Sequence, residues 1–226
     1  MDDAEVEAAK RRAGERAADA VSDGAVVGLG TGSTAASAIR RLGQRIDAGL
    51  DVRGVPTSIG AASIARKVGV PVVSLADATP DIAIDGADQI SGCDVIKGGG
   101  GAHAREKVVA AAADRFVVVV DKRKQAEALS LPVPLEVLEP AIPPVREAVC
   151  DLGGSASVRE AGGKDGPVVT DNGHPVLDAD FGTITEPARL DDNLNGIPGL
   201  IAHGLFVDRA DAVMIGTTDG VRQRSC

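Results

Sequence analysis

Short apolar runs alternate with helix-forming segments through the first half of the chain, and this alternation constrains the fold more than any other feature. The runs that predict strands occupy residues 25–30, 52–55, 70–75, 82–84 and 116–120, and the helical patterns occupy residues 6–21, 33–42, 59–68 and 104–113. Strands separated by helices pair in parallel, and helices then cover both faces of the sheet. The sequence therefore predicts an α/β fold built on a Rossmann-like parallel sheet.

The pattern changes after Leu131 to the order strand, helix, strand, strand, helix, strand. The segments are residues 131–137, 145–152, 155–160, 168–180, 186–194 and 200–206, with an Asp-Asn-Gly turn at residues 171–173. This βαββαβ order is typical of a small ferredoxin-like α+β unit. A last buried run, residues 211–216, is expected to return to the first sheet. We predict a Rossmann-like catalytic domain of residues 1–130 and 207–226, with a ferredoxin-like domain of residues 131–206 inserted before the C-terminal strand.

The charge of the chain disfavours two classes of partner. The formal net charge is −9, whereas nucleic acids and anionic membranes are bound through clustered Lys and Arg. No apolar run approaches the roughly 20 residues that a membrane-spanning helix needs, and the acidic start at residues 1–5 is unlike a signal peptide. We expect a cytoplasmic protein with no nucleic acid and no membrane as partner, in which an anionic substrate needs a local basic site.

The three cysteines lie far apart in the sequence. Cys93, Cys150 and Cys226 form no CxxC or Cys/His spacing. This pattern predicts neither a disulfide framework nor a zinc site. We expect three free thiols.

The segment Gly28-Leu-Gly-Thr-Gly-Ser-Thr34 lies between a predicted strand and a predicted helix. Backbone N–H groups at such a helix N-terminus, exposed by glycine and supplemented by hydroxyl groups, form an anion site that suits a phosphate. The dinucleotide fingerprint GxGxxG would need glycine at position 33, where this chain has serine. The alternative interpretation is a tight turn with a capping Ser or Thr.

Two carboxylates follow the apolar run that ends at Ile84, in the order Asp85-Gly-Ala-Asp88. The carboxyl ends of parallel strands line the ligand crevice, so both aspartates are placed to meet sugar hydroxyls. Two close carboxylates can also raise one another's pKa and take part in proton transfer. The alternative is an Asp-Gly turn in which Asp88 caps a helix. No His or third carboxylate is spaced to complete a metal site.

The most specific segment is Lys97-Gly-Gly-Gly-Gly-Ala-His-Ala-Arg-Glu-Lys107. Four consecutive glycines cost conformational entropy on folding, so a close approach of backbone to ligand explains them better than packing does. Lys97 can neutralise an oxyanion, and Glu106 can direct a carboxylate from the first turn of a helix. Glu106 could instead pair with a neighbouring cation on a solvated face. We interpret His103 as a surface or capping residue without a catalytic role.

Taken together, these segments resemble the ribose-5-phosphate isomerase A family. The matching segments are residues 28–34, Asp85 with Asp88, residues 97–107, 121–125, 169–173, 196–199, 204–206, 215–217 and 219–221. Order and spacing agree, and the resemblance covers nearly the whole chain. His103 departs from the apolar residue or Thr that is frequent in the family, and residues 57–60 depart from its serine-rich form, which leaves their part in substrate contact open.

The resemblance implies an aldose–ketose isomerase of pentose phosphate metabolism, which interconverts D-ribose 5-phosphate and D-ribulose 5-phosphate through an enediolate. It implies that Glu106 is the proton acceptor and that Asp85, Asp88 and Lys97 hold or titrate the sugar end. The substrate-binding residues would be Lys10, Gly30, Thr31, Gly32, Ser33, Thr34, Gly86, Ala87, Gly98, Gly99, Gly100 and Lys124. The resemblance further implies no cofactor, no metal, and assembly as a homodimer or homotetramer.

Two other functions stay open. A coenzyme A transferase of related architecture uses a glutamate as nucleophile, and a search for a glutamyl adduct after incubation with an acyl-CoA would distinguish it. A sugar-phosphate-sensing domain would bind the same ligand without turnover, so an isomerase assay would distinguish it. Sensors of this kind carry a DNA-binding helix-turn-helix, and nothing basic precedes Val6.

The acidic residues also generate a prediction about salt. Asp outnumbers Glu by 23 to 10 and Arg outnumbers Lys by 17 to 7, which fits a salt-rich cytoplasm because salt screens the repulsion between surface charges. We expect the melting temperature to be higher in molar KCl than in low salt. A melting curve in each condition tests this, and destabilisation by molar KCl would contradict it.

Overall fold

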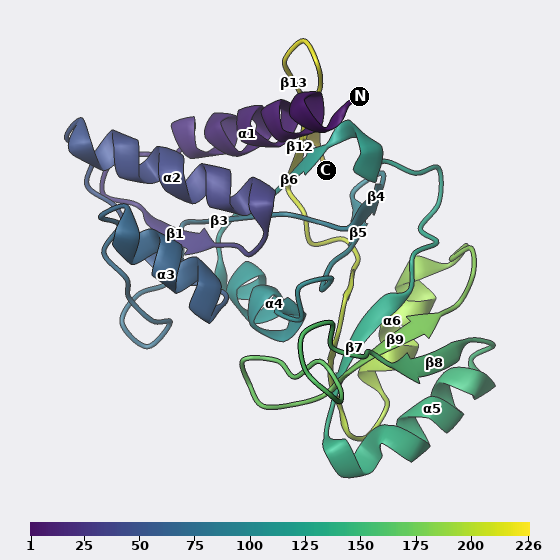
Figure 1. Cartoon of the computed structure of the whole chain (residues 1–226). Helices are drawn as coiled ribbons and strands as arrows, with labels where there is room; N and C mark the ends of the chain where they lie inside the picture. The colour runs from purple at the N-terminus through teal and green to yellow at the C-terminus, as the bar shows by residue number, and fades with distance from the viewer. The chain divides into compact units, whose positions relative to one another are not determined.

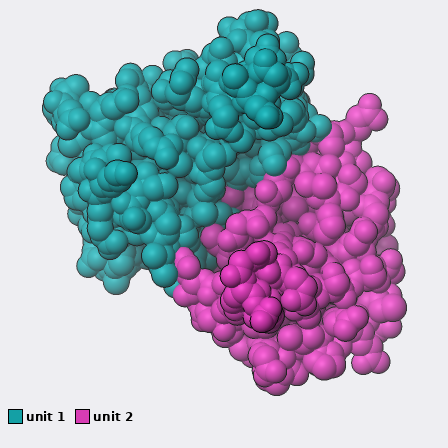
Figure 2. Space-filling model, in the orientation of Figure 1, with its two compact units in different colours: residues 1–87, 105–125, 208–226 teal, residues 88–104, 126–207 magenta.

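The computed structural model describes residues 1–226 and divides into two compact units (Figures 1 and 2). Unit 1 consists of residues 1–87, 105–125 and 208–226, and unit 2 consists of residues 88–104 and 126–207. The domain boundaries predicted from the sequence differ from this division, because they assign residues 88–104, 126–130 and 207 to the first domain. Unit 2 therefore contains the glycine run that the sequence analysis treated as part of the Rossmann-like domain.

Unit 1 is built on a six-stranded sheet with the order β13-β12-β6-β3-β1-β2. The strands are β1 (Val26–Leu29), β2 (Arg53–Pro56), β3 (Ile82–Asp85), β6 (Phe116–Asp121), β12 (Ala212–Gly216) and β13 (Val221–Ser225). All neighbours pair in parallel except β13, which is antiparallel to β12. This agrees with the predicted parallel sheet, and the run at residues 211–216 does return to it as β12. The sequence did not predict β13, whose residues are mostly polar and exposed.

One predicted strand of unit 1 is wrong. Residues 70–75 form no strand, and only an isolated bridge joins Val72 to Gly54. Pro71 has no N–H to donate to a ladder, so this apolar run can pair for no more than a residue or two. The run still packs, since Val70 is buried in the core.

Helices cover both faces of this sheet. They are α1 (Asp3–Asp19), α2 (Ser33–Asp47), α3 (Ile59–Lys67) and α4 (His103–Ala112), and α1 lies beside α2 (Figure 1). Val27 and Leu29 of β1 pack in one core with residues of α1, α2 and α3. Gly28 points to the opposite face, where a Cβ would lie 2.7 Å from Val109 Cγ1 of α4. The alternation of side chains along β1 thus separates the two helical layers.

Unit 2 contains a four-stranded antiparallel sheet with the order β10-β7-β9-β8. Its elements are β7 (Val133–Val137), η2 (Glu139–Ala141), α5 (Ile142–Asp151), β8 (Ser155–Val158), β9 (Val176–Asp180), α6 (Pro187–Asn195) and β10 (Leu200–His203). The order along the chain is the predicted ferredoxin-like βαββαβ. The predicted strand at residues 168–180 is only partly present, because β9 begins at Val176 and residues 168–170 make isolated bridges and single hydrogen bonds.

Unit 2 also contains a three-stranded sheet that the sequence did not predict. It consists of β4 (Gln89–Ser91), β5 (Asp94–Ile96) and β11 (Leu205–Phe206), in the order β11-β5-β4. The predicted strand at residues 200–206 is therefore split: β10 ends at His203, and after Gly204 the chain pairs with β5. A side chain at position 204 would overlap the carbonyl of Lys97. This glycine allows β11 to run close to the segment that carries Lys97.

Two further predictions concern cysteine and the membrane. Cys93 and Cys226 are each disulfide-bonded and Cys150 is a free thiol, so the expectation of three free thiols is wrong. The spacing of cysteines in a sequence does not by itself exclude a disulfide, which is why this expectation failed. None of the helices has both the length and the apolar character required to cross a bilayer.

Candidate active site

The carboxyl ends of the parallel strands of unit 1 carry most of the predicted substrate-binding residues of that unit. The strand order reverses at β1, which has β2 on one side and β3 on the other. Ligands of open α/β sheets bind at such a reversal, because the loops that leave the two strands diverge and open a crevice. The loop after β1 begins at Gly30 and β3 ends at Asp85, so both of these residues lie at the reversal.

Asp85 is held by the backbone of two turns. Its Oδ1 atom accepts hydrogen bonds from Thr31 N at 3.0 Å and from Gly86 N at 2.7 Å. A side chain at Gly30 would overlap this carboxylate, and its Cβ would also lie 2.5 Å from Asp85 Cα. Position 30 therefore has to be glycine for the carboxylate to reach the end of β1. The structure thus brings Gly30, Thr31 and Asp85 together.

The turn at residues 30–34 leaves the start of α2 without a side-chain cap. Gly32 is the N-cap residue with φ 106°, and it makes no side-chain hydrogen bond to the helix. The alternative interpretation, a turn capped by Ser or Thr, is therefore wrong. Ser33 and Thr34 lie in the first turn of α2. The uncapped N–H groups and the positive end of the helix favour an anion here.

Thr57 and Ser58, whose part in substrate contact the sequence leaves open, support this turn. Thr31 Oγ1 lies 2.8 Å from Thr57 Oγ1 and 2.8 Å from Ser58 Oγ, and both partners are buried. Ser58 also caps α3, since its Oγ accepts a hydrogen bond from Ala61 N at 3.0 Å. The signal that could have identified them is a pair of hydroxyl residues directly after the strand β2 and before a helix. Residues of the turn and of α3 together line a hollow of about 280 Å³: Gly30, Thr31, Gly32, Ser33, Ala36, Gly60, Ala61 and Ile64.

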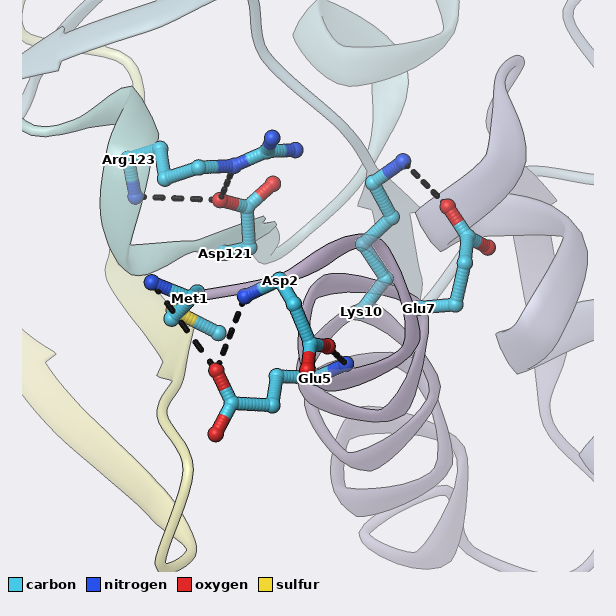
Figure 3. Close-up of polar contacts among 7 residues, drawn as sticks. All are labelled: Met1, Asp2, Glu5, Glu7, Lys10, Asp121 and Arg123. Carbon is cyan, nitrogen blue, oxygen red and sulfur yellow. Dashed lines mark hydrogen bonds and ion pairs between the residues drawn. The ribbon is translucent and has the colours of Figure 1, made fainter.

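The basic candidates of unit 1, Lys10 and Lys124, lie on α1 and on the short helix η1 (Lys122–Lys124) after β6. Figure 3 shows the Lys10 ammonium directed at Glu7, with a separation of 2.7 Å. It also shows Asp121 accepting hydrogen bonds from Arg123 N at 3.0 Å and Arg123 Nε at 2.9 Å. Arg123 therefore provides the ion pair of the buried Asp121.

The electrostatics of Asp121 follow from these contacts. Burial acts to raise the pKa of Asp121, but the hydrogen bonds from Arg123 and the charges of Arg123 and Lys124 outweigh burial and lower it. Asp121 therefore stays ionised at neutral pH.

In unit 2, the glycine run forms a turn that holds Asp88. Gly99 N donates a hydrogen bond to Asp88 Oδ2 at 2.7 Å, and Gly101 N donates to Gly98 O at 3.0 Å. Gly98 and Gly101 have φ values of 101° and 70°, which only glycine adopts without strain. Asp88 is followed by β4 and does not cap a helix, so that alternative interpretation is wrong.

Lys97 precedes this turn and is buried. Its backbone N donates to Gly204 O at 2.8 Å, and its ammonium lies 5.8 Å from the centre of the Phe206 ring. An aromatic face attracts a cation most strongly where water is excluded. Because β11 carries Phe206 and pairs with β5, the small unpredicted sheet fixes the position of Lys97.

Glu106 lies in the first turn of α4 and is only 5% exposed, whereas Arg105 and Lys107 are half-buried. This burial contradicts the alternative in which Glu106 is a charge on a solvated face. His103 is fully buried, and a Cβ on Gly98 would lie 2.7 Å from its Nδ1. The interpretation of His103 as a surface residue is wrong, because its ring packs beneath the glycine turn.

The predicted site residues are divided between the two units. Unit 1 carries Lys10, Gly30, Thr31, Gly32, Ser33, Thr34, Asp85, Gly86, Ala87, Glu106 and Lys124, and unit 2 carries Asp88, Lys97, Gly98, Gly99 and Gly100. The chain passes between the units directly after Ala87 and directly before Arg105. No group of three or more His, Cys, Asp or Glu side chains is arranged to hold a metal ion.

Comparisons with known proteins identify relatives over almost the full length of the chain. Residues 53–220 match the family model of ribose 5-phosphate isomerase A (phosphoriboisomerase A). The ribose-5-phosphate isomerase A of Natronomonas pharaonis is 59% identical over 218 residues, which are 96% of this chain and 97% of the relative. That of Methanothermobacter thermautotrophicus is 46% identical over 94% of this chain and 96% of the relative.

Solved structures give the same result. Ribose 5-phosphate isomerase A from Methanocaldococcus jannaschii matches with a TM-score of 0.94 at 41% identity, over 97% of this chain and 99% of the other. A D-ribose-5-phosphate isomerase in complex with phospho-erythronic acid matches with a TM-score of 0.95 at 40% identity, over 98% of this chain and 99% of the other. The predicted fold class is confirmed.

The contact between Gly30 and Asp85 generates a prediction about stability. Gly30→Ala places a methyl group where the Asp85 carboxylate and Cα lie, so the free energy of unfolding should fall by about 1 to 3 kcal/mol or more, as for overpacking in a well-packed core. Gly220→Ala is the control, because a Cβ there meets nothing within 4 Å. Urea unfolding measures both, and equal stability of the two variants would contradict the geometry described here.

Proposed function

Because the chain belongs to the ribose 5-phosphate isomerase A family and is an enzyme that interconverts ribose 5-phosphate and ribulose 5-phosphate, we propose that Glu106 is the general base of this reaction. The observation that carries the proposal is the burial of the Glu106 carboxylate in the first turn of α4, directly after the glycine turn in the chain. A helical surface charge would be solvated, whereas a base that works on a carbon acid has to be shielded from competing water.

The chemistry requires one proton to move between two carbons. A base removes the proton beside the carbonyl group, an enediolate forms, and the proton returns to the neighbouring carbon. A single carboxylate can make both transfers when it faces both carbons. Glu106 fits this role, since its position in a helix gives the carboxylate a rigid support.

The enediolate oxygen needs positive charge close to it. We propose that the Lys97 ammonium and N–H groups of the glycine turn supply that charge, a role worth about 3 to 4 kcal/mol for each well-placed donor. Burial of Lys97 beside the Phe206 ring supports this proposal, because a charge in a low-dielectric site interacts more strongly than one in water. A fixed ammonium can replace a metal ion in this step, so we propose a reaction without metal or cofactor.

The aspartates suit the hydroxyl groups of the sugar. We propose that Asp85, with Asp88, moves hydroxyl protons when the furanose ring opens, which has to precede isomerisation. Both carboxylates accept hydrogen bonds from backbone N–H groups of glycine-containing turns. Such bonds fix a carboxylate in one orientation, which suits a group that exchanges protons with a bound sugar.

The phosphate would bind at the opposite end of the sugar. We propose that the turn at residues 30–34 holds it through N–H and hydroxyl groups, and that Lys124 and Lys10 add positive charge. The hollow beside this turn and the uncapped start of α2 support the proposal. A solved relative that binds phospho-erythronic acid indicates that proteins of this type accept a phosphorylated acid, which combines a phosphate with a carboxylate.

We further propose that the enzyme works in the cytoplasm, in non-oxidative pentose phosphate metabolism, as a homodimer or homotetramer. Support for assembly comes from β10, which lies at an edge of its sheet and exposes Ile201 to 42%. An apolar edge strand offers unpaired N–H and C=O groups to a second copy. A monomeric scattering mass across a wide range of protein concentration would contradict this assembly.

The general base generates a direct prediction. Glu106→Gln keeps the shape of the side chain and removes the basic oxygen, so the fold and sugar-phosphate binding should persist. Turnover of ribose 5-phosphate should fall by roughly 10² to 10⁴, the range for a lost general base. Exchange of the substrate C2 proton with deuterated solvent should fall equally, because exchange needs the same abstraction. Both are measured in excess EDTA, where the parent should stay active.

The neighbouring cations provide matched controls. Arg105→Gln and Lys107→Gln alter half-buried charges on the same helix turn and should change turnover by no more than a few-fold. A folded Glu106→Gln variant that isomerises as fast as these controls would disprove the proposed base, and Asp85 would then be tested in its place.

A further inference from the structure

Arg159 is a residue of unit 2 to which neither the sequence analysis nor the proposed reaction assigns a role. It follows β8 directly, and its backbone continues the pairing, because Arg159 N donates to Val176 O at 2.9 Å and Val168 N donates to Arg159 O at 2.7 Å. Its side chain is only 17% exposed. A guanidinium costs free energy to bury unless its donors are satisfied.

The guanidinium joins the sheet to the glycine turn. Arg159 Nε donates to Asp178 Oδ2 at 2.8 Å, and a second nitrogen contacts Asp178 Oδ1. The remaining terminal nitrogen donates to Gly98 O at 2.9 Å and to Gly99 O at 3.1 Å. Asp178 lies on β9, opposite Ser157 of β8. The planar guanidinium has several N–H donors, so one arginine side chain can donate hydrogen bonds to a carboxylate and to two carbonyl groups at the same time.

These contacts determine which way the peptide groups of the turn point. In a trans peptide the C=O and the following N–H point in opposite directions. Gly98 O faces Arg159, and accordingly Gly99 N–H faces away and donates to Asp88 Oδ2 at 2.7 Å. Gly99 O also faces Arg159, so the N–H of the exposed Gly100 is directed away from it too. Two successive N–H groups that turn the same way form a nest for negative charge.

A run of four glycines would not keep this arrangement by itself. Glycine has the largest choice of backbone conformations, so an unrestrained turn would sample many orientations of its N–H groups. Donors stabilise a developing oxyanion well only when they are fixed before the reaction starts. Arg159 supplies such a restraint from the rigid β8–β9 pair.

We propose that Arg159, anchored by Asp178, is a positioning residue of the isomerase. It orients the glycine turn so that Gly99 N–H fixes the Asp88 carboxylate and Gly100 N–H faces the carbonyl end of the sugar. Arg159 acts through the peptide groups and touches no substrate. This inference rests on the proposed role of the turn in stabilising the enediolate.

The test is Arg159→Met, which keeps the bulk of the side chain and removes its donors. The kcat for ribose 5-phosphate should fall roughly tenfold or more, since misplaced catalytic donors cost about this much or more. The KM and the inhibition constant of inorganic phosphate should stay within about threefold, because the phosphate is proposed to bind to unit 1. Arg146→Met is the control: Arg146 Nε donates to Ala156 O at 3.0 Å in the same unit, and it does not contact the turn.

Two further variants keep the test decisive if Arg159→Met does not fold. Arg159→Lys keeps the charge next to Asp178 but cannot fork to both carbonyl groups, so its kcat should lie between those of the parent and Arg159→Met. Methylguanidinium added to Arg159→Ala should restore part of the kcat, and it should not change that of Arg146→Ala.

Three outcomes would overturn the inference: a folded Arg159→Met variant with the parental kcat, an Arg159→Lys variant with the parental kcat, or a loss confined to thermal stability or KM. None of these depends on the identity of the base, so they are distinguishable from a failure of Glu106→Gln. If Glu106→Gln kept its activity while Arg159→Met lost kcat, the positioning role would stand and the base would be another residue.

Discussion

The close approach of Asp85 to the turn after β1 is the contact on which the arrangement of unit 1 depends. The parallel register pairs Leu29 of β1 with Ile84 of β3, so the two strands end side by side. The Asp85 carboxylate then occupies the space where a side chain at position 30 would lie. Glycine there is therefore a consequence of the sheet register. In the same arrangement the Thr31 N–H donates a hydrogen bond to the Asp85 carboxylate, and the Thr31 hydroxyl forms hydrogen bonds with the hydroxyls of Thr57 and Ser58.

Unit 2 uses the same principle at its own glycine turn. Asp88 is fixed by Gly99 N–H just as Asp85 is fixed by Thr31 and Gly86 N–H. Both aspartates are therefore oriented by backbone donors.

The sequence predicted the long, strongly apolar elements and the motifs, and it failed where structure arises from short or distant contacts. The strands β6 and β12 were predicted, whereas β4, β5 and β11 have only two or three residues each and no periodicity to detect. Residues 70–75 are apolar but contain Pro71, which cannot donate to a ladder, and only one isolated bridge forms there. Arg159 escaped notice because it lies 61 residues from the Gly98 carbonyl that it contacts, and no local sequence pattern indicates so distant a contact.

Several arginines form ion pairs with aspartates in this molecule. Arg41, Arg123 and Arg159 each pair with an aspartate, which suits the planar, forked guanidinium. The ion pair of Asp121 with Arg123 at the end of β6 shows how such a contact changes the pKa of a carboxyl group. Burial alone would raise the pKa of Asp121, but Arg123, helped by Lys124, lowers it below its usual value of 3.8. A carboxyl group whose pKa is lowered by folding stabilises the folded state when the pH is above the usual pKa of 3.8. This stability is lost as the pH falls from 3.8 through the lowered pKa of the folded state. At neutral pH the carboxylate is thus ionised and paired with Arg123.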